Sequence, residues 1–204
     1  MTPLPHTAGA ASFSPCGQYR WWLERQWAPA RPRLLFIGLN PSRADGDRDD
    51  TTLRRLLGFA DRWGYGALEV LNLFARISPA PAVLRRAADP VGPANDGWLQ
   101  ARLAAQPLAP LWLGWGNHGV WRGRARLVLH QLDLSGGRQR AVFCLGLTAG
   151  GQPRHPLYLP ATAAPLQWCW QAGPGLGHPE THCSGSASSS PCREPPAATP
   201  SICT

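Results

Sequence analysis

The segment Arg33-Leu-Leu-Phe-Ile-Gly-Leu-Asn-Pro-Ser42 decides the fold of this 204-residue chain. Its short apolar run ends at Gly38, and the turn-forming pair Asn40-Pro41 follows closely. This order predicts a buried strand over 33–38 that runs directly into a loop. A strand without polar alternation is typical of a parallel sheet that is covered on both faces. The rest of the chain should therefore supply more strands and the helices that cover them.

Three more apolar runs alternate with helical patterns after this strand. The first helix is the clearest, because its apolar residues from Leu53 to Trp63 share one face and Asp50 precedes it as an N-cap. The pattern predicts strands over 33–38, 67–74, 110–114 and 140–146, and helices over 52–63, 81–88, 93–105 and 117–132. This alternation predicts an α/β fold, a three-layer α/β/α sandwich around a central, mainly parallel four-stranded sheet.

Composition divides the chain into a leader, one domain and a tail. Residues 171–204 are rich in Gly, Pro, Ser and Thr, and such a segment cannot bury enough apolar surface to offset the entropy of ordering. We expect a disordered leader over 1–12, a single domain over 13–170 and a disordered tail over 171–204. No apolar stretch approaches the roughly 18 residues of a membrane span, and no secretory signal is visible. We therefore expect a cytoplasmic monomer with no membrane partner.

All 20 basic residues are arginines, and the formal net charge is +8. Guanidinium groups suit bidentate contacts with phosphate, so a nucleic acid or a nucleotide is an expected partner. A GC-rich coding sequence also produces a chain rich in Ala, Arg, Pro and Gly without lysine, and this second explanation stays open. The six cysteines include no C-x-x-C pair, so no metal site built on sulfur is expected, and no cofactor.

Polar residues follow the predicted strands, at the edge where an open parallel sheet binds its ligands. An amide at Asn40 can hold a water, one at Asn72 can hydrogen-bond the edge of a base, and a neutral His155 can donate to an oxygen that gains charge. Each also has a structural explanation: Asn40 as a turn residue, Asn72 as a strand cap and His155 as a surface imidazole. Ser42 and Arg154 are candidates for contacts with phosphate.

Two further motifs match known sites only in form. Gly114-Trp-Gly-Asn-His-Gly119 fits the pattern G-x-G-x-x-G, but it follows the third strand and no acidic residue closes the next one. A nucleotide-binding enzyme that uses this loop therefore ranks last among the alternatives. An acidic run follows the first strand and consists of Asp45, Asp47, Asp49 and Asp50. It does not fit the pattern of an EF-hand, and three explanations stay open: a magnesium site, helix capping or solvation of the surface.

Six motifs occur in order between residues 17 and 168. They are Leu35-Phe-Ile-Gly-Leu-Asn-Pro-Ser42, Asp49-Asp50, Trp63-Gly-Tyr-Gly66, Asn72-Leu-Phe74, Trp115-Gly-Asn-His-Gly119 and Gly150-Gly-Gln-Pro-Arg-His-Pro-Leu-Tyr-Leu-Pro160. Together they resemble the bacterial domain-of-unknown-function family 1643 (DUF1643). The name of that family implies no activity.

More distantly, the same landmarks resemble the uracil-DNA glycosylase superfamily. Its first motif, a G-x-N-P or G-x-D-P loop, is similar to Gly38-Leu-Asn-Pro41, and its last, a His-Pro loop after the fourth strand, is similar to His155-Pro156. The resemblance implies that Asn72 binds a flipped base, His155 stabilises the departing base and Asn40 positions the attacking water. It further implies that Phe74 stacks on the base and that Leu157 or Tyr158 wedges into the gap that the base leaves. The residues implied to contact phosphates are Ser42, Arg43 and Arg154.

The chain departs from that superfamily in ways that leave two hypotheses. Because the amide of Asn40 cannot accept a proton as a carboxylate does, the site would be slow unless Asp45 or Asp49 acts as the base. The His-Pro loop continues with Leu157 where many of those glycosylases have a serine. We therefore expect either a glycosylase-like enzyme that removes a damaged or modified base, from DNA ahead of RNA, or a non-catalytic module that reads such a base or nucleotide.

Overall fold

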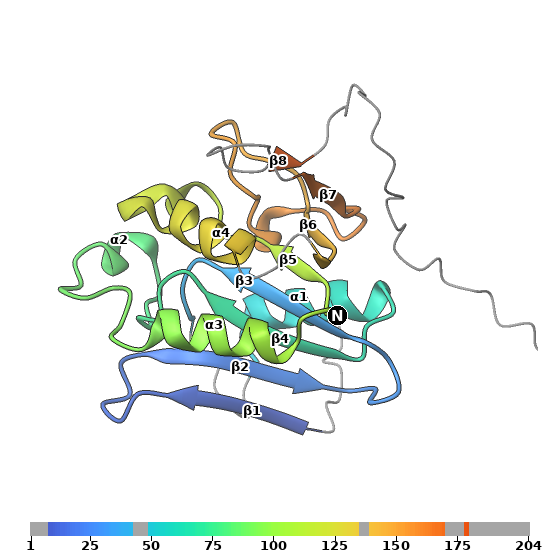
Figure 1. Ribbon diagram of the computed structural model, residues 1–204, viewed down its shortest axis with the longest axis horizontal. Coiled ribbons are helices and arrows are strands. Elements are labelled where there is room, and N and C mark those ends of the chain that lie inside the picture. The colour runs from blue at the N-terminus through green and yellow to red at the C-terminus, as the bar shows by residue number, and fades with distance from the viewer. Residues whose placement is uncertain (1–7, 43–48, 135–138, 170–177, 180–204) are drawn as a thin grey trace, which may run out of the picture.

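The computed structural model describes residues 8–42, 49–134, 139–169 and 178–179, and a parallel sheet forms its centre (Figure 1). The central strands are β3 (Arg33–Gly38), β4 (Ala67–Asn72), β5 (Leu111–Leu113) and β6 (Val142–Cys144), in the spatial order β4-β3-β5-β6. Each neighbouring pair among them is parallel, so their carboxyl ends lie along one edge of the sheet. These are the four strands that the apolar runs predicted.

Antiparallel strands extend this sheet on both sides. β2 (Arg20–Gln26) pairs with β4 and β1 (Ala8–Phe13) pairs with β2, whereas β7 (Leu166–Cys169) pairs with β6 and β8 (His178–Pro179) with β7. The prediction of only four strands is therefore wrong, and the sheet is mixed. Residues 8–12, which the composition placed in a leader, belong to β1. Of the tail expected over 171–204, the structure describes residues 178–179 alone.

Helices cover both faces of the sheet (Figure 1). α1 (Thr51–Arg62) covers one face, α3 (Asn95–Ala105) and α4 (Arg124–Leu134) cover the other, and α2 (Pro81–Leu84) is a single turn. Asp50 caps α1, as predicted, by accepting a hydrogen bond of 2.8 Å from the backbone N–H of Leu53. The helix predicted over 117–132 is two elements, the 3-10 helix η1 (Asn117–Gly123) and α4, because the backbone leaves helical geometry at Trp121 and Arg122.

Two apolar cores join the sheet to its helices. In β3, Leu34 and Phe36 pack toward α1, and Leu35 and Ile37 pack toward α3 and α4. Trp112 of β5 is fully buried in the α1 core, where aromatic neighbours surround its ring: Phe36, Phe59, Trp63 and Phe143. This α/β arrangement fixes the carboxyl ends of the central strands as one rim. No helix within the described ranges is long and apolar enough to cross a membrane.

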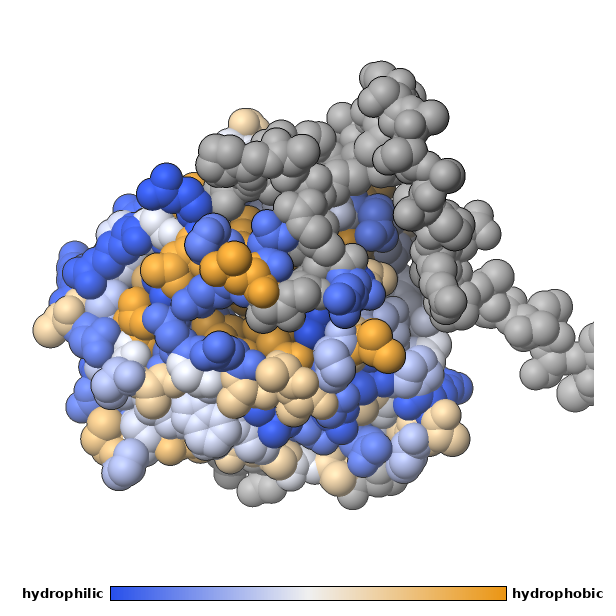
Figure 2. Space-filling model, in the orientation of Figure 1, coloured by the Kyte–Doolittle hydropathy of each residue, from blue (hydrophilic) through white to orange (hydrophobic). Residues whose placement is uncertain are grey.

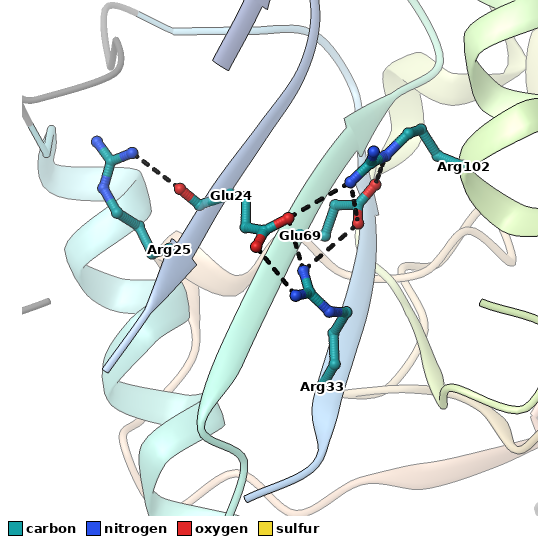
Figure 3. A network of polar contacts seen from close by, with 5 residues as sticks. All are labelled: Glu24, Arg25, Arg33, Glu69 and Arg102. Carbon is teal, nitrogen blue, oxygen red and sulfur yellow. Dashed lines mark hydrogen bonds and ion pairs between the residues drawn. The ribbon is translucent and has the colours of Figure 1, made fainter. Parts of the chain in front are cut away.

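Glu24 of β2 takes part in an ion-pair network with residues of the neighbouring strands and of α3 (Figure 3). Glu24 of β2 lies opposite Glu69 of β4, and both carboxylates bind Arg33 of β3 and Arg102 of α3. The distances are 2.7 Å from Arg33 Nη1 to Glu24 and 2.9 Å from Arg102 Nη2 to Glu69. The guanidinium of Arg102 also lies 4.4 Å from the ring centre of Trp22. This ion-pair network joins three strands and one helix.

Candidate functional site

A pocket opens at the carboxyl ends of β3 and β4, next to the loop that follows β6. It contains about 340 Å³ of atom-free space, part of it open to solvent. Apolar side chains from the strands and from α1 form much of its wall, among them Phe36, Leu56 and Val70. The pocket brings together Asn40, Asn72 and His155, whose positions at strand ends predicted a shared site, and it also includes Ser42, a candidate for a phosphate contact. The segment 114–119, which follows the end of β5, does not line it.

Asn40 is held in a fixed orientation by the loop between β4 and α2. Its amide nitrogen donates to the carbonyl oxygens of Pro41 and Ser78, at 2.9 Å in each case. Ser78 is itself fixed, because its N–H donates to the carbonyl of Pro41 and its hydroxyl donates to that of Ala80. Since these two bonds use the amide hydrogens, Asn40 can act on a ligand or a water through Oδ1, as an acceptor.

Asn72 ends β4 and is 3% exposed. In the amide orientation that satisfies its hydrogen bonds, its nitrogen donates to the carbonyls of Leu71 and Asn40, at 3.3 Å each. The amide also lies against Gly38, where a Cβ atom would come within 3.2 Å of it and within 2.9 Å of the Phe36 ring. The absence of a side chain at Gly38 therefore lets Asn72 join the end of β4 to the Asn40 loop.

His155 stands before the single-turn 3-10 helix η3 (Pro156–Tyr158) in the loop after β6. Its Nδ1 accepts a hydrogen bond of 3.3 Å from the backbone N–H of Leu157. Burial lowers the pKa of His155 below its ordinary value of 6.5, so the ring is neutral at neutral pH. Because Nδ1 is the acceptor, the proton of the neutral ring lies on Nε2. His155 thus brings a neutral N–H donor to the pocket wall.

Hydrogen bonds hold the His155 loop against the segment that follows β5. The N–H of Gly116 donates to the carbonyl of Pro153 at 2.8 Å. The indole N–H of Trp115, a residue that is 1% exposed, donates to Gln152 Oε1 at 3.0 Å. The backbone N–H of Gln152 donates to the hydroxyl of Thr148 at 3.1 Å. We call Trp115, Gln152 and Thr148 the loop clamp.

Gly114 and Gly119 of the segment 114–119 have packing roles. A Cβ atom on Gly114 would lie 2.6 Å from the Phe36 ring. A Cβ atom on Gly119 would lie 2.1 Å from the Trp115 ring. Real Cβ contacts are longer, so these positions accept only glycine while the two aromatic rings stay in place. Packing at Gly114 and Gly119, together with the left-handed φ of 67° at Gly116, therefore explains the G-x-G-x-x-G match without a bound dinucleotide.

Four residues to which the resemblance gave a role do not line the pocket: Phe74, Arg154, Leu157 and Tyr158. Phe74 is fully buried in the core between the sheet and α4, where its ring packs on Trp121 at a centroid distance of 5.1 Å. Arg154 is exposed on the His155 loop and is not part of the pocket wall. Arg43 lies outside the described residues, as do Asp45 and Asp47.

The two described members of the acidic run have structural partners. Asp49 accepts a hydrogen bond of 2.9 Å from the guanidinium of Arg25, whose side chain is fully buried. Asp50 caps α1. Neither carboxylate lines the pocket, so the structure does not place Asp49 as a base there. Within the part of the chain that the structure describes, no three His, Cys, Asp or Glu side chains come together as metal ligands would.

Arg20 is a pocket residue that sequence reasoning missed. It begins β2, is 3% exposed and contributes a guanidinium group to the lining. Its backbone N–H donates to the carbonyl of Ala75 just beyond β4, at 3.0 Å. No local signal separates Arg20 from the other arginines. Only the antiparallel pairing of β2 with β4 brings the first residue of β2 to the carboxyl edge of the central strands.

A second groove lies between α3 and α4, where Figure 2 shows apolar side chains gathered on the surface. It contains about 680 Å³ of atom-free space, part of it open to solvent, and Gln100 and Gln131 are its polar lining residues. This lining contains no titratable group, whereas the first pocket combines an imidazole, a guanidinium and two amides. The groups that can do chemistry therefore identify the first pocket as the candidate site.

Comparisons with known proteins bear on the motifs. No curated protein and no solved structure matches the chain. A family model described as "Protein of unknown function (DUF1643)" matches residues 20–157, a range that contains every residue lining the pocket. The chain therefore belongs to the DUF1643 family.

Proposed function

We propose that this pocket receives a damaged or modified base flipped out of a nucleic acid, DNA ahead of RNA, and cleaves its N-glycosidic bond. The observation that carries the proposal is the meeting of Asn40 and His155 in one pocket, from the loops that follow β3 and β6. Their order along the chain is that of the first and last motifs of the uracil-DNA glycosylase superfamily. A fold like that of the superfamily belongs to the same proposal.

The pocket residues suit the charge that this reaction develops. When the bond between base and sugar breaks, its electron pair leaves with the base. The neutral N–H at Nε2 of His155 would donate to a base oxygen that gains negative charge. A water held by Oδ1 of Asn40 would bond to the sugar carbon through its oxygen. Its proton would pass to solvent, because the described lining of the pocket contains no carboxylate.

A non-catalytic reader of a modified base or nucleotide is the second candidate, and one observation favours it. The described lining offers no carboxylate that could act as a general base, and Asp49, which the sequence suggested for that role, is paired with Arg25. A site that only holds a base needs hydrogen bonds and an apolar wall but no proton acceptor. Such a reader would bind the modified base through the same pocket without releasing it.

Base release from oligonucleotides tests the first candidate against the second. Single and double strands that carry uracil, hypoxanthine, xanthine or an alkylated base are incubated with the wild-type protein, His155→Ala and His130→Ala. His130 is exposed on α4 and controls for the loss of an imidazole. We expect wild type and His130→Ala to release one of these bases, and His155→Ala to be slower by about 100-fold or more. No release by wild type, while a working glycosylase acts on the same substrates, would favour the reader.

A further inference from the structure

Exposed arginines gather where α2 ends and where η1 leads into α4. Arg85 and Arg86 follow α2, Arg122 lies near the end of η1, and Arg126 lies in the first turn of α4. All four side chains are exposed. The two segments touch, because a guanidinium nitrogen of Arg85 lies 3.2 Å from Nδ1 of the exposed His118. We call these five residues the basic surface.

The two segments that carry the basic surface contain no acidic residue of their own. Residues 81–88 and 117–127 contain no Asp or Glu. Arg124, which lies between the surface arginines, is buried and is paired with Asp96 at 2.6 Å, so it does not belong to the basic surface. Four arginines thus leave a concentrated positive charge exposed to solvent.

Arg122 keeps its charged side chain at a position that glycine would fit better. Its φ is 54°, and among the described residues it is the one non-glycine residue with a positive φ. This left-handed conformation costs stability for any residue with a Cβ atom. Its guanidinium lies over the ring of Trp121, 4.9 Å from the ring centre, and remains exposed. The backbone cost therefore points to a use for the guanidinium at the surface.

The two segments that carry the basic surface start near the loops that hold Asn40 and His155. Asn40 donates to the carbonyl of Ser78, and α2 starts close by at Pro81. On the other side, a Cβ atom on Gly116 would lie 3.7 Å from Cβ of His155, and η1 starts at the next residue. Both segments of the basic surface thus leave the same edge of the sheet as the two central residues of the pocket.

We propose that the basic surface binds the phosphate backbone of the nucleic-acid strand whose base enters the pocket. Guanidinium groups form charge-assisted, bidentate hydrogen bonds with phosphate, and several of them side by side can follow a backbone. This inference rests on the nucleic-acid partner of the proposed function but not on base release. It adds phosphate ligands that the sequence did not indicate.

Binding of unmodified DNA tests the basic surface separately from base release. Labelled single and double strands are titrated with wild type and with Arg85→Gln/Arg122→Gln at several salt concentrations. We expect the Kd of the variant to rise about tenfold, and the slope of log Kd against log salt to fall by about 1.4 to 1.8, since each lost phosphate contact accounts for roughly 0.7 to 0.9. An unchanged Kd and slope would overturn the proposal.

Arg31→Gln/Arg62→Gln is the matched control, because it removes the same charge from exposed arginines at the opposite edge of the sheet. Arg31 precedes β3 and Arg62 ends α1. We expect its Kd to stay within about twofold of wild type, as long-range charge alone contributes little at physiological salt. A loss equal to that of Arg85→Gln/Arg122→Gln would show that net charge, and not this surface, binds DNA.

Arg122→Gly separates binding from folding. It removes the guanidinium and relieves the backbone, so we expect an unchanged or higher melting temperature together with a severalfold weaker Kd for DNA. A lower melting temperature with an unchanged Kd would assign Arg122 a structural role and contradict the proposal. Poly-glutamate is the second probe, and binding as tight as that of DNA would also contradict it. Because the DNA is unmodified, a failure of base release with intact binding would count against the pocket proposal alone.

Discussion

Burial lowers the pKa of the imidazole at position 155, and one backbone hydrogen bond sets its tautomer. Because the pKa of His155 is lowered below 6.5, the folded protein keeps this ring neutral at a pH where an exposed histidine is already protonated. We predict that base release stays constant as pH falls through 6.5 and decreases only at lower pH. A pH–rate profile, with an NMR titration of the His155 ring, measures both quantities. An acid limb at or above pH 6.5 would contradict the account.

The same shift makes stability depend on pH. Below the unfolded-state pKa of about 6.5 the unfolded chain binds a proton at His155 that the folded chain does not, so acid favours unfolding. The free energy of unfolding should therefore fall as pH drops from 6.5 toward the lowered pKa of the folded state. His155→Ala should show a smaller fall over this window than His130→Ala, in denaturant titrations at matched pH. Equal pH dependence in the two variants would count against a buried neutral His155.

Asparagine at position 40 is needed for its two donated hydrogen bonds. Asn40→Asp would place a carboxylate oxygen against the carbonyls of Pro41 and Ser78, so we predict a loss of about 2 kcal/mol in the free energy of unfolding at pH 7. The loss should shrink at pH 4, where the acid form can donate. Asn117→Asp is the control, because Asn117 Oδ1 accepts from the Thr148 hydroxyl and a carboxylate can do the same. Equal losses in the two variants would contradict this role.

Which site residues could be predicted depended on where they stand relative to the strands. Asn40, Asn72 and His155 follow short apolar runs, and parallel strands place their carboxyl ends at one edge, so their meeting was predictable from the sequence. Phe74 was not, because it lies beyond the end of β4, where strand alternation no longer fixes the side-chain direction, and its ring packs in the α4 core instead. Arg20 was not predictable either, because its place depends on a strand pairing that no local pattern showed.

The loop clamp is the element that presents His155 to the pocket. Gln152→Leu leaves the buried indole N–H of Trp115 without its acceptor, which should cost about 1 to 3 kcal/mol. We also predict a change in the NMR chemical shifts of the His155 ring and slower base release. Gln100→Leu, an exposed glutamine on α3, should change none of these quantities. Unaltered His155 shifts in Gln152→Leu would show that the clamp does not position the ring.

The ion-pair network fixes β2 on the central sheet. Glu69 is fully buried, and Glu69→Gln would leave Arg102 and Arg33 without one of their carboxylates, so we predict a destabilisation of roughly 2 kcal/mol. Asp61→Asn removes an exposed ion pair with Arg31 and should cost at most about 1 kcal/mol. Denaturant titration at neutral pH compares the two. Equal losses of stability in Asp61→Asn and Glu69→Gln would contradict the view that burial makes the network contribute more than an exposed ion pair.

The network also explains why the sheet was only partly predictable. The four central strands are uninterrupted apolar runs, because both faces are covered, and each was predicted near its observed position. β2 carries Glu24 on the face toward α3, and a charged residue in a strand normally predicts a solvent-facing position. Only the tertiary structure shows that Glu69 and Arg102 lie beside it. The break between η1 and α4 was hidden for a similar reason, since Arg122 is an ordinary helix-forming residue whose φ is set by tertiary structure.

Across the whole molecule, arginine serves two different purposes. Arg25, Arg124 and Arg140 are buried and bind carboxylates or backbone carbonyls, so they hold elements together. The basic surface instead exposes its charge beside the pocket. The count of 20 arginines therefore overstates how many guanidinium groups are free to bind phosphate. Composition alone predicted a nucleic-acid or nucleotide partner, and the proposal now assigns the phosphate contacts to the basic surface at one edge of the sheet.

The most direct test of the central claim measures binding and base release on the same oligonucleotide under single-turnover conditions. The proteins are wild type, Asn40→Ala and Gln100→Ala, the last of which removes an exposed amide of α3 outside the pocket. We predict that Asn40→Ala releases the base about 100-fold more slowly while its Kd stays within about threefold, and that Gln100→Ala resembles wild type. Equal rates of release for wild type and Asn40→Ala would contradict catalysis in this pocket.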